Sequence, residues 1–160
     1  MSAIDVKTIT KILDAMIQFE LSLSDFYTKC AETWDEDVTF WHILATAEAH
    51  HAENIQKMLD IITHKLERFE AGRPFNLVAL NTALAGIAEN TTRVSKGEFS
   101  RERIHVMARD IEQSILESHY AEIVNTTDVE YLTLMKDILS QTYEHKKIIQ
   151  EKIDAMRTKS

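Results

Sequence analysis

The stretch WHILATAEAHHAENI, residues 41–55, has apolar side chains at the three- and four-residue spacing of an amphipathic helix, interrupted by a glutamate and a histidine. Glu48 and His51 fall on the same stripe as Trp41 and Ile55, and this stripe is the one expected to face a core. Burying a carboxylate is unfavourable unless a metal, a proton or a cation compensates it. The stretch therefore predicts a buried polar site inside a helical protein.

The run of sequence that precedes this stretch has the same feature. Its apolar stripe contains one charged member, and the stripe consists of Ile9, Leu13, Met16, Glu20, Leu23, Tyr27 and Cys30. Glu20 lies fourteen residues before Trp34 and Glu48 lies fourteen residues after it, so a tight turn at Trp34 sets both carboxylates at one height. At a rise of about 1.5 Å per residue, that height is about 20 Å from the turn. We therefore expect Glu20 to face Glu48 and His51.

Composition favours one helical domain. The 160 residues are 44% hydrophobic and 28% charged, and they include only three Gly and one Pro. So few turn-forming residues are typical of long helices and not of a many-stranded sheet, and the length suits a single domain over residues 1–160. The fold class predicted from composition is all-α.

Charge and cysteine content exclude several classes of function. The formal net charge of -8 argues against nucleic acid or a membrane surface as partner, because both favour clustered Lys and Arg. Cys30 is the only cysteine, so the chain can build neither an internal disulfide, nor a Cys-rich zinc site, nor a rubredoxin-type iron centre. Without an apolar signal core or a membrane-length apolar stretch, the sequence predicts a cytoplasmic protein.

Helical periodicity and capping signals predict two helix hairpins joined by a long crossover. The expected helices cover about residues 4–33, 38–69, 101–124 and 128–156, with a shorter helix from 77 to the polar stretch 90–97. The expected capping residues are Ser2 with Asp5, Asn76, Ser100, and Thr127 with Glu130. The long connection falls between about residues 72 and 99, and no sheet is expected. Two such hairpins can pack as a four-helix bundle with a site built from facing side chains.

The second hairpin adds two candidates at the same height. Taking Thr127 as its turn, Glu112 lies fifteen residues before it and Thr142 lies fifteen residues after it. His145, three residues further on, then occupies the level that His51 occupies in the first hairpin. Glu112 borders an apolar seam, so the pattern leaves two interpretations of this residue open, a metal ligand or a solvated carboxylate. His145 is compatible either with a ligand or with a hydrogen-bonded core histidine.

On these residues the chain resembles the ferritin-like superfamily and, within it, the rubrerythrin-like branch. The resemblance rests on Glu20 followed by Phe26 and Tyr27, on the run EAHHAE at 48–53, and on the hairpin, crossover, hairpin order over nearly the whole chain. It implies a ferritin-like four-helix bundle in which each hairpin supplies one Glu from its first helix and a Glu-x-x-His from its second. In that family the set holds two irons or a related pair of metals.

The first hairpin matches the family pattern and the second departs from it. Aligning Tyr120 with Tyr27 puts Gln113 where the pattern has glutamate, although Glu112 is adjacent. Aligning His145 with His51 puts Thr142 where the second bridging glutamate belongs. The candidate metal ligands are Glu20, Glu48, His51, Glu112 and His145. This set is one carboxylate short, so a full metal pair, one firmly held metal with a weak second, and a single metal all remain open.

The resemblance implies a di-iron oxidoreductase or peroxidase that reduces peroxide or oxygen, with electrons from an external donor protein. Carboxylate and imidazole ligands also suit zinc, nickel or copper. The alternative is a degenerate bundle with a single metal or none and a non-enzymatic binding or assembly role, which Thr142 and Gln113 favour. A homodimer is a further implication of the family. His119 is expected near the bundle axis, either as an irregular ligand or hydrogen-bond donor or as a core residue.

Overall fold

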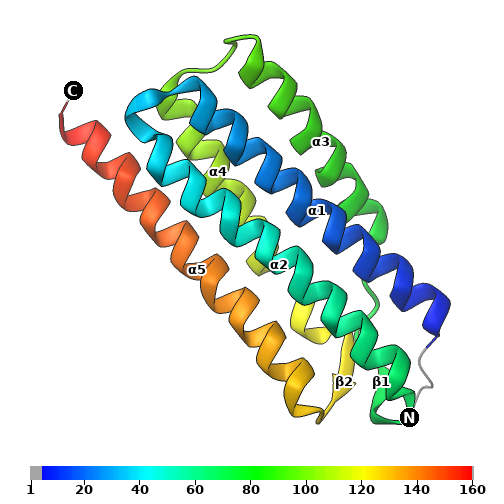
Figure 1. Ribbon diagram of the computed structural model, residues 1–160. Coiled ribbons are helices and arrows are strands. Elements are labelled where there is room, and N and C mark those ends of the chain that lie inside the picture. Colours follow the sequence, from blue (N-terminus) through cyan, green and yellow to red (C-terminus); the bar gives the residue numbers. More distant parts are fainter. Residues whose placement is uncertain (1–4, 160) are drawn as a thin grey trace.

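The computed structural model describes residues 5–159, which form a bundle of α-helices with one small sheet (Figure 1). The helices are α1 (Val6–Thr33), α2 (Val38–His64), α3 (Leu77–Ser95), α4 (Arg101–Glu117) and α5 (Val129–Thr158), and the strands are β1 (Phe69–Ala71) and β2 (Val124–Thr126). The all-α class predicted from composition is confirmed.

The helices pack as two pairs with the crossover helix on the outside. α1 packs along α2, and α4 packs along α5, while contacts between α2 and α5 join the two pairs. The connection between α2 and α4 contains α3, which runs along α1 and brings the chain back to the end of the bundle where α1 turns into α2 (Figure 1). The order of the helices is therefore the order predicted from the sequence.

Side-chain hydrogen bonds explain where most helices begin. Asn76 accepts from the backbone N–H of Ala79, and Ser100 accepts from that of Arg103, so both predicted caps are confirmed. Asp5 caps α1 by accepting from the Lys7 N–H at 3.1 Å. The capping box predicted for Ser2 with Asp5 lies partly outside the described residues, because these begin at residue 5.

The capping box predicted at Thr127 is wrong by one residue. α5 is capped by Asp128, whose carboxylate accepts from the Tyr131 N–H at 3.0 Å. The same carboxylate lies 3.4 Å from Lys65 Nζ and 3.3 Å from Arg68 Nη1. An ionised cap with cationic partners satisfies the free N–H groups at the helix start more strongly than a hydroxyl does.

The prediction of no sheet, and of two longer helices, is also wrong. α2 ends at His64 and not near Phe69, and α4 ends at Glu117 and not near Val124. The residues beyond these ends form β1 and β2, which pair antiparallel with Phe69 opposite Thr126. Phe69 and Val124 are each only 4% exposed, so extended backbone here closes the end of the bundle with apolar side chains.

Gly72 permits the chain to leave this sheet close to the opposite strand. Its N–H donates to the Ile123 carbonyl at 3.1 Å. A side chain at position 72 would collide with the backbone oxygen of Glu122, so only glycine allows this approach.

A buried ion cluster fastens the other end of the bundle. Asp37, in the turn between α1 and α2, is 1% exposed. Arg101 at the start of α4 donates to its carboxylate at 2.6 and 2.7 Å, and Lys152 Nζ on α5 lies 3.2 Å away. The first hairpin is thereby tied to both helices of the second. Among residues 5–159, no helix combines the length and the apolar character needed to cross a membrane.

Candidate metal centre

The middle of the bundle contains a group of buried polar side chains contributed by all four helices of the two pairs. Four of its members are 0% exposed and the fifth is 7% exposed. They are Glu20 on α1, Glu48 and His51 on α2, Glu112 on α4 and His145 on α5. The structure thus brings together all five residues selected from the sequence, each by the face of its helix that packs inward.

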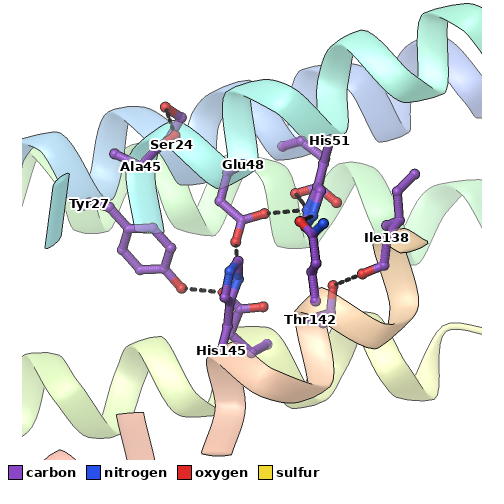
Figure 2. A network of polar contacts seen from close by, with 11 residues as sticks. Ser24, Tyr27, Ala45, Glu48, His51, Ile138, Thr142 and His145 are labelled. Carbon is purple, nitrogen blue, oxygen red and sulfur yellow. Dashed lines mark hydrogen bonds and ion pairs between the residues drawn. The ribbon is translucent and has the colours of Figure 1, made fainter. Parts of the chain in front are cut away.

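Glu48 lies at the centre of this group. Its Oε2 atom is 3.0 Å from His51 Nδ1, and its Oε1 atom is 2.8 Å from His145 Nδ1 (Figure 2). Each oxygen of one carboxylate therefore faces a different imidazole, and the two imidazoles stack with their centroids 5.8 Å apart.

Glu48 is consequently a member of two groups that can each hold a metal ion. One group is Glu20, Glu48 and His51, and the other is Glu48, Glu112 and His145. Within each group the potential ligand atoms lie within 4.8 Å of one another, and all of the residues are buried. The weaker contacts are His51 Nδ1 to Glu20 Oε2 at 3.9 Å and His145 Nδ1 to Glu112 Oε1 at 3.5 Å.

Several carboxylate oxygens in the centre lack a hydrogen-bond partner within the described residues. They are both oxygens of Glu20 and the Oε2 atom of Glu112. A buried polar atom without a partner costs about 1–3 kcal/mol, and more if it is charged. Carboxylate oxygens directed into a shared interior beside two imidazoles are the donor set that a divalent cation satisfies, so the residues present fit a metal.

The surroundings raise the pKa of two of the carboxyls. Burial raises the pKa of Glu20 well above its ordinary value, and the negative charge of Glu48 adds to the effect. Burial and the charge of Glu48 likewise raise the pKa of Glu112 to about 8. Without a metal, burial and the neighbouring negative charge therefore favour the protonated form of both carboxyls.

The third carboxyl behaves in the opposite way. Burial acts to raise the pKa of Glu48, but hydrogen bonds from His145 and His51 outweigh burial and hold that pKa well below its ordinary value. Burial acts to lower the pKa of His145, but Glu112 and Glu48 outweigh burial and raise that pKa to about 10. In the metal-free centre, Glu48 and His145 therefore form an ion pair, and Glu48 also accepts a hydrogen bond from His51.

Two buried tyrosines adjoin the centre. The Tyr27 hydroxyl donates to Glu112 Oε1 at 2.7 Å, and the Tyr27 ring stacks on Trp41 with centroids 5.5 Å apart. Burial raises the pKa of Tyr27, as do the charges of Glu112 and Glu48, so its hydroxyl remains a donor. Burial and the charges of Glu20 and Glu48 likewise raise the pKa of Tyr120.

The second hairpin does not supply a fourth carboxylate. Thr142 is 0% exposed, but its hydroxyl donates along its own helix to the Ile138 carbonyl at 2.8 Å (Figure 2). The Gln113 amide donates to Glu117 at 2.7 Å. The candidate ligand set is therefore the one counted from the sequence, three carboxylates and two histidines.

Two features of the site differ from the sequence analysis. Gln141, which the sequence analysis missed, has its Oε1 atom 2.8 Å from His51 Nε2. In the sequence, the one indication of Gln141 is that it precedes Thr142, at the level of the site. Gln141 is exposed, so it does not belong to the repeating apolar pattern from which the other site residues were identified.

His119 is neither a ligand nor a core residue: its side chain is 51% exposed and lies 2.7 Å from Glu122 Oε2. It adopts a left-handed conformation, φ 63°, beyond the end of α4, and this turn directs it away from the axis.

Comparisons of the chain with protein-family models, with curated proteins and with solved structures find no match.

Proposed function

We propose that this protein is a metal-binding protein of the ferritin-like kind, and specifically a rubrerythrin-like di-metal oxidoreductase or peroxidase that acts on peroxide or oxygen. The observation that carries the proposal is the shared position of Glu48, with one oxygen toward each of two buried histidines. A carboxylate shared in this way by two ligand groups is what a pair of adjacent cations requires.

The ligand assignment follows from the two groups. Glu20 and His51 would hold one metal, Glu112 and His145 would hold the other, and Glu48 belongs to both groups. The resemblance stated from the sequence favours iron, whereas the ligand types alone also suit zinc, nickel or copper.

The reaction places defined demands on the protein. Reduction of one peroxide to two waters takes two electrons and two protons. A pair of ferrous ions, when bound, would supply the two electrons. The protein excludes bulk water, since four of the five candidate ligands are 0% exposed. Tyr27 orients the Glu112 carboxyl through its hydrogen bond. A proton is held close by, at the Tyr27 hydroxyl, whose pKa burial and the neighbouring carboxyl charges raise.

The electrons that regenerate the centre come from another protein. Cys30 is the only cysteine in the chain, it is buried, and burial raises the pKa of its thiol. A protonated, buried thiol does not exchange electrons with a soluble donor. We therefore propose an external electron-donor protein as a partner, and a homodimer as the assembly that the family resemblance implies.

The test is metal content followed by reaction with peroxide. Protein purified without a metal-affinity tag is analysed for metals, then stripped, loaded with Fe²⁺ under argon and mixed with peroxide. We expect two irons per chain and oxidation of two irons for each peroxide consumed. Failure to retain or take up any divalent metal would refute the proposal.

A second candidate function is a degenerate bundle with a single metal or none and a binding or assembly role. Thr142 favours this alternative, because it stands where a fourth carboxylate would be needed and its hydroxyl donates to the Ile138 carbonyl of its own helix. Under this alternative, metal content stays at or below one per chain, and peroxide does not oxidise the bound iron faster than it oxidises free Fe²⁺.

A further inference from the structure

The two buried imidazoles of the centre differ at the ring nitrogen that faces away from it. His51 Nε2 lies 2.8 Å from Gln141 Oε1. An amide oxygen only accepts hydrogen bonds, so the Nε2 atom of His51 carries a proton and donates it. With Nε2 held by Gln141, Nδ1 is the nitrogen that a metal would take, in exchange for the proton that Nδ1 donates to Glu48.

The other nitrogen of His51 points at the ligand carboxylates. His51 Nδ1 lies 3.0 Å from Glu48 Oε2 and 3.9 Å from Glu20 Oε2. A histidine whose outer N–H is held by an acceptor is fixed in tautomer and in ring orientation, and loss of such a partner typically weakens metal binding 10- to 100-fold. The group of Glu20, Glu48 and His51 is therefore arranged for a metal before the metal arrives.

His145 lacks the corresponding support. Its Nδ1 atom lies 2.8 Å from Glu48 Oε1 and 3.5 Å from Glu112 Oε1. Its Nε2 atom has no hydrogen-bond partner in the part of the chain that the structure describes, residues 5–159. The Glu48, Glu112 and His145 group thus has a less constrained imidazole, and it is also the group beside Thr142.

We propose that Gln141 is a positioning residue that presets His51, so that the Glu20, Glu48, His51 group binds the first metal tightly and the Glu48, Glu112, His145 group binds the second more weakly. This inference rests on the proposed metal-binding function and adds an order of filling to it. Gln141 lies on α5, so the second hairpin supports a ligand of the first although it lacks a fourth carboxylate.

The test compares Co²⁺ binding to the metal-free full chain and to variants, by calorimetry and by the absorption of bound Co²⁺. Gln141→Met keeps the length of the side chain and removes the acceptor. We expect its tighter site to bind Co²⁺ 10- to 100-fold more weakly, with the weaker site changed less than threefold. Gln141→Glu restores an acceptor and should recover the tighter site. Gln56→Met is the matched control, because the Gln56 amide on α2 donates to Asp60 at 3.1 Å and to no other side chain within residues 5–159.

A second readout separates positioning from packing. In Zn²⁺-loaded protein, the ring ¹⁵N spectrum should show a slowly exchanging proton on His51 Nε2, which Gln141→Met should lose and Gln141→Glu should keep. Gln141 is exposed, so these substitutions should leave the fold intact, and Gln141→Ala gives a second variant without an acceptor.

The outcomes distinguish the two claims. If the unmodified protein binds neither Co²⁺ nor Zn²⁺, both the proposed function and this inference fail. If it binds them and Gln141→Met or Gln141→Ala keeps the affinity of the tighter site within twofold, the inference fails and the proposed function stands.

Discussion

Among the single residues of the centre, Glu20 has both carboxyl oxygens buried without a hydrogen-bond partner in residues 5–159. Glu20→Met removes this unfavourable burial and fills the same space. We expect it to raise the free energy of unfolding of the metal-free protein by about 1–3 kcal/mol, and to abolish metal binding in the first group. Chemical denaturation in the presence of a chelator measures the first effect.

Substitution of Glu48 serves as the control, because it is expected to lower the free energy of unfolding of the metal-free protein. Glu48→Met leaves the protonated imidazole of His145 without its closest carboxylate, which lies 2.8 Å away in the unmodified protein. Removing one partner of a buried ion pair costs about 3–5 kcal/mol. A Glu20→Met protein less stable than the unmodified chain under the same conditions would contradict the account of Glu20.

Raised pKa values predict how stability depends on pH. The pKa of Glu112 is raised from 4.5 to about 8 and that of His145 from 6.5 to about 10 in the folded protein. Over these ranges the native state holds protons that the unfolded state has released, so stability falls as pH rises. The metal-free protein should therefore unfold at lower denaturant concentration at about pH 9 than at about pH 6.

Metal binding should respond to pH in the opposite direction. A ligating carboxylate or imidazole must give up its proton, so metal affinity should rise over the same range and binding should release protons into a weakly buffered solution. Glu112→Gln removes one of the groups and should flatten the stability profile below about pH 8. An unchanged profile in this variant would show that Glu112 is ionised in the metal-free protein.

The candidate ligands could be predicted from the sequence because the residues on a buried helix face recur every three to four positions. A charged residue at one of these otherwise apolar positions is easily recognised. Glu20 and Glu48 were found in this way, and their equal distances from Trp34 correctly placed them at one height. Gln141 was not found, because it lies on an exposed face and contacts His51, ninety residues away in the chain. Periodicity records which residues are buried and not which side chains reach inward from the surface.

At the scale of elements, the helix ends show where local sequence signals stop being sufficient. Asn76 and Ser100 were predicted as caps because a cap bonds only to its own first turn. The ends of α2 and α4 were placed too far along the chain, because the pairing of β1 with β2 joins segments more than fifty residues apart. Such pairing depends on the assembled bundle, which brings the two ends together.

The ion cluster at the turn between α1 and α2 gives an element-scale prediction. Arg101 pairs with Asp37 through two hydrogen bonds, at 2.6 and 2.7 Å. Arg101→Met leaves a carboxylate that is 1% exposed with Lys152 as its remaining close cation. We expect the free energy of unfolding to fall by about 1–3 kcal/mol, as measured by denaturation at neutral pH.

The pH dependence of this loss provides a further check. Burial acts to raise the pKa of Asp37, but hydrogen bonds from Arg101 and Lys152 outweigh burial and lower it. The stabilisation is therefore present above the unfolded-state value of 3.8 and is lost as pH falls through the lower, folded value. Arg73→Met is the matched control, since Arg73 pairs at 3.3 Å with Glu122 and both side chains are more than half exposed. The control should change stability by less than about 0.5 kcal/mol.

At the scale of the whole molecule, the centre couples the two hairpins. Its ligand groups both contain Glu48 from the first hairpin, and the second group takes Glu112 and His145 from the other. A metal that binds the folded protein and not the unfolded chain stabilises the whole bundle, by about 2.7 kcal/mol at a free concentration one hundred times the dissociation constant. Binding of a metal to the second group can therefore be measured as an increase in the free energy of unfolding, without a catalytic assay.

Thr142 decides whether that second group can be completed, because it stands on α5 one turn before His145 with its hydroxyl bonded to Ile138. Thr142→Glu adds a fourth carboxylate to an interior that already holds three. We expect the metal-free variant to be less stable by about 1–3 kcal/mol, because a further buried acid lacks a partner. With Co²⁺ or Fe²⁺ present, the order should reverse, since four carboxylates balance two divalent ions.

The measurements for this last prediction are metal content per chain and denaturation with and without Co²⁺. Thr142→Val is the control: it keeps the shape of the side chain and adds no ligand, so it should leave metal content unchanged. A rise to two tightly bound metals in Thr142→Glu would show that the missing carboxylate alone limits the second position. If Thr142→Glu stays at or below one metal per chain and Glu48→Ala loses none, the shared carboxylate has no metal to bridge. The di-metal oxidoreductase proposal then gives way to the degenerate bundle.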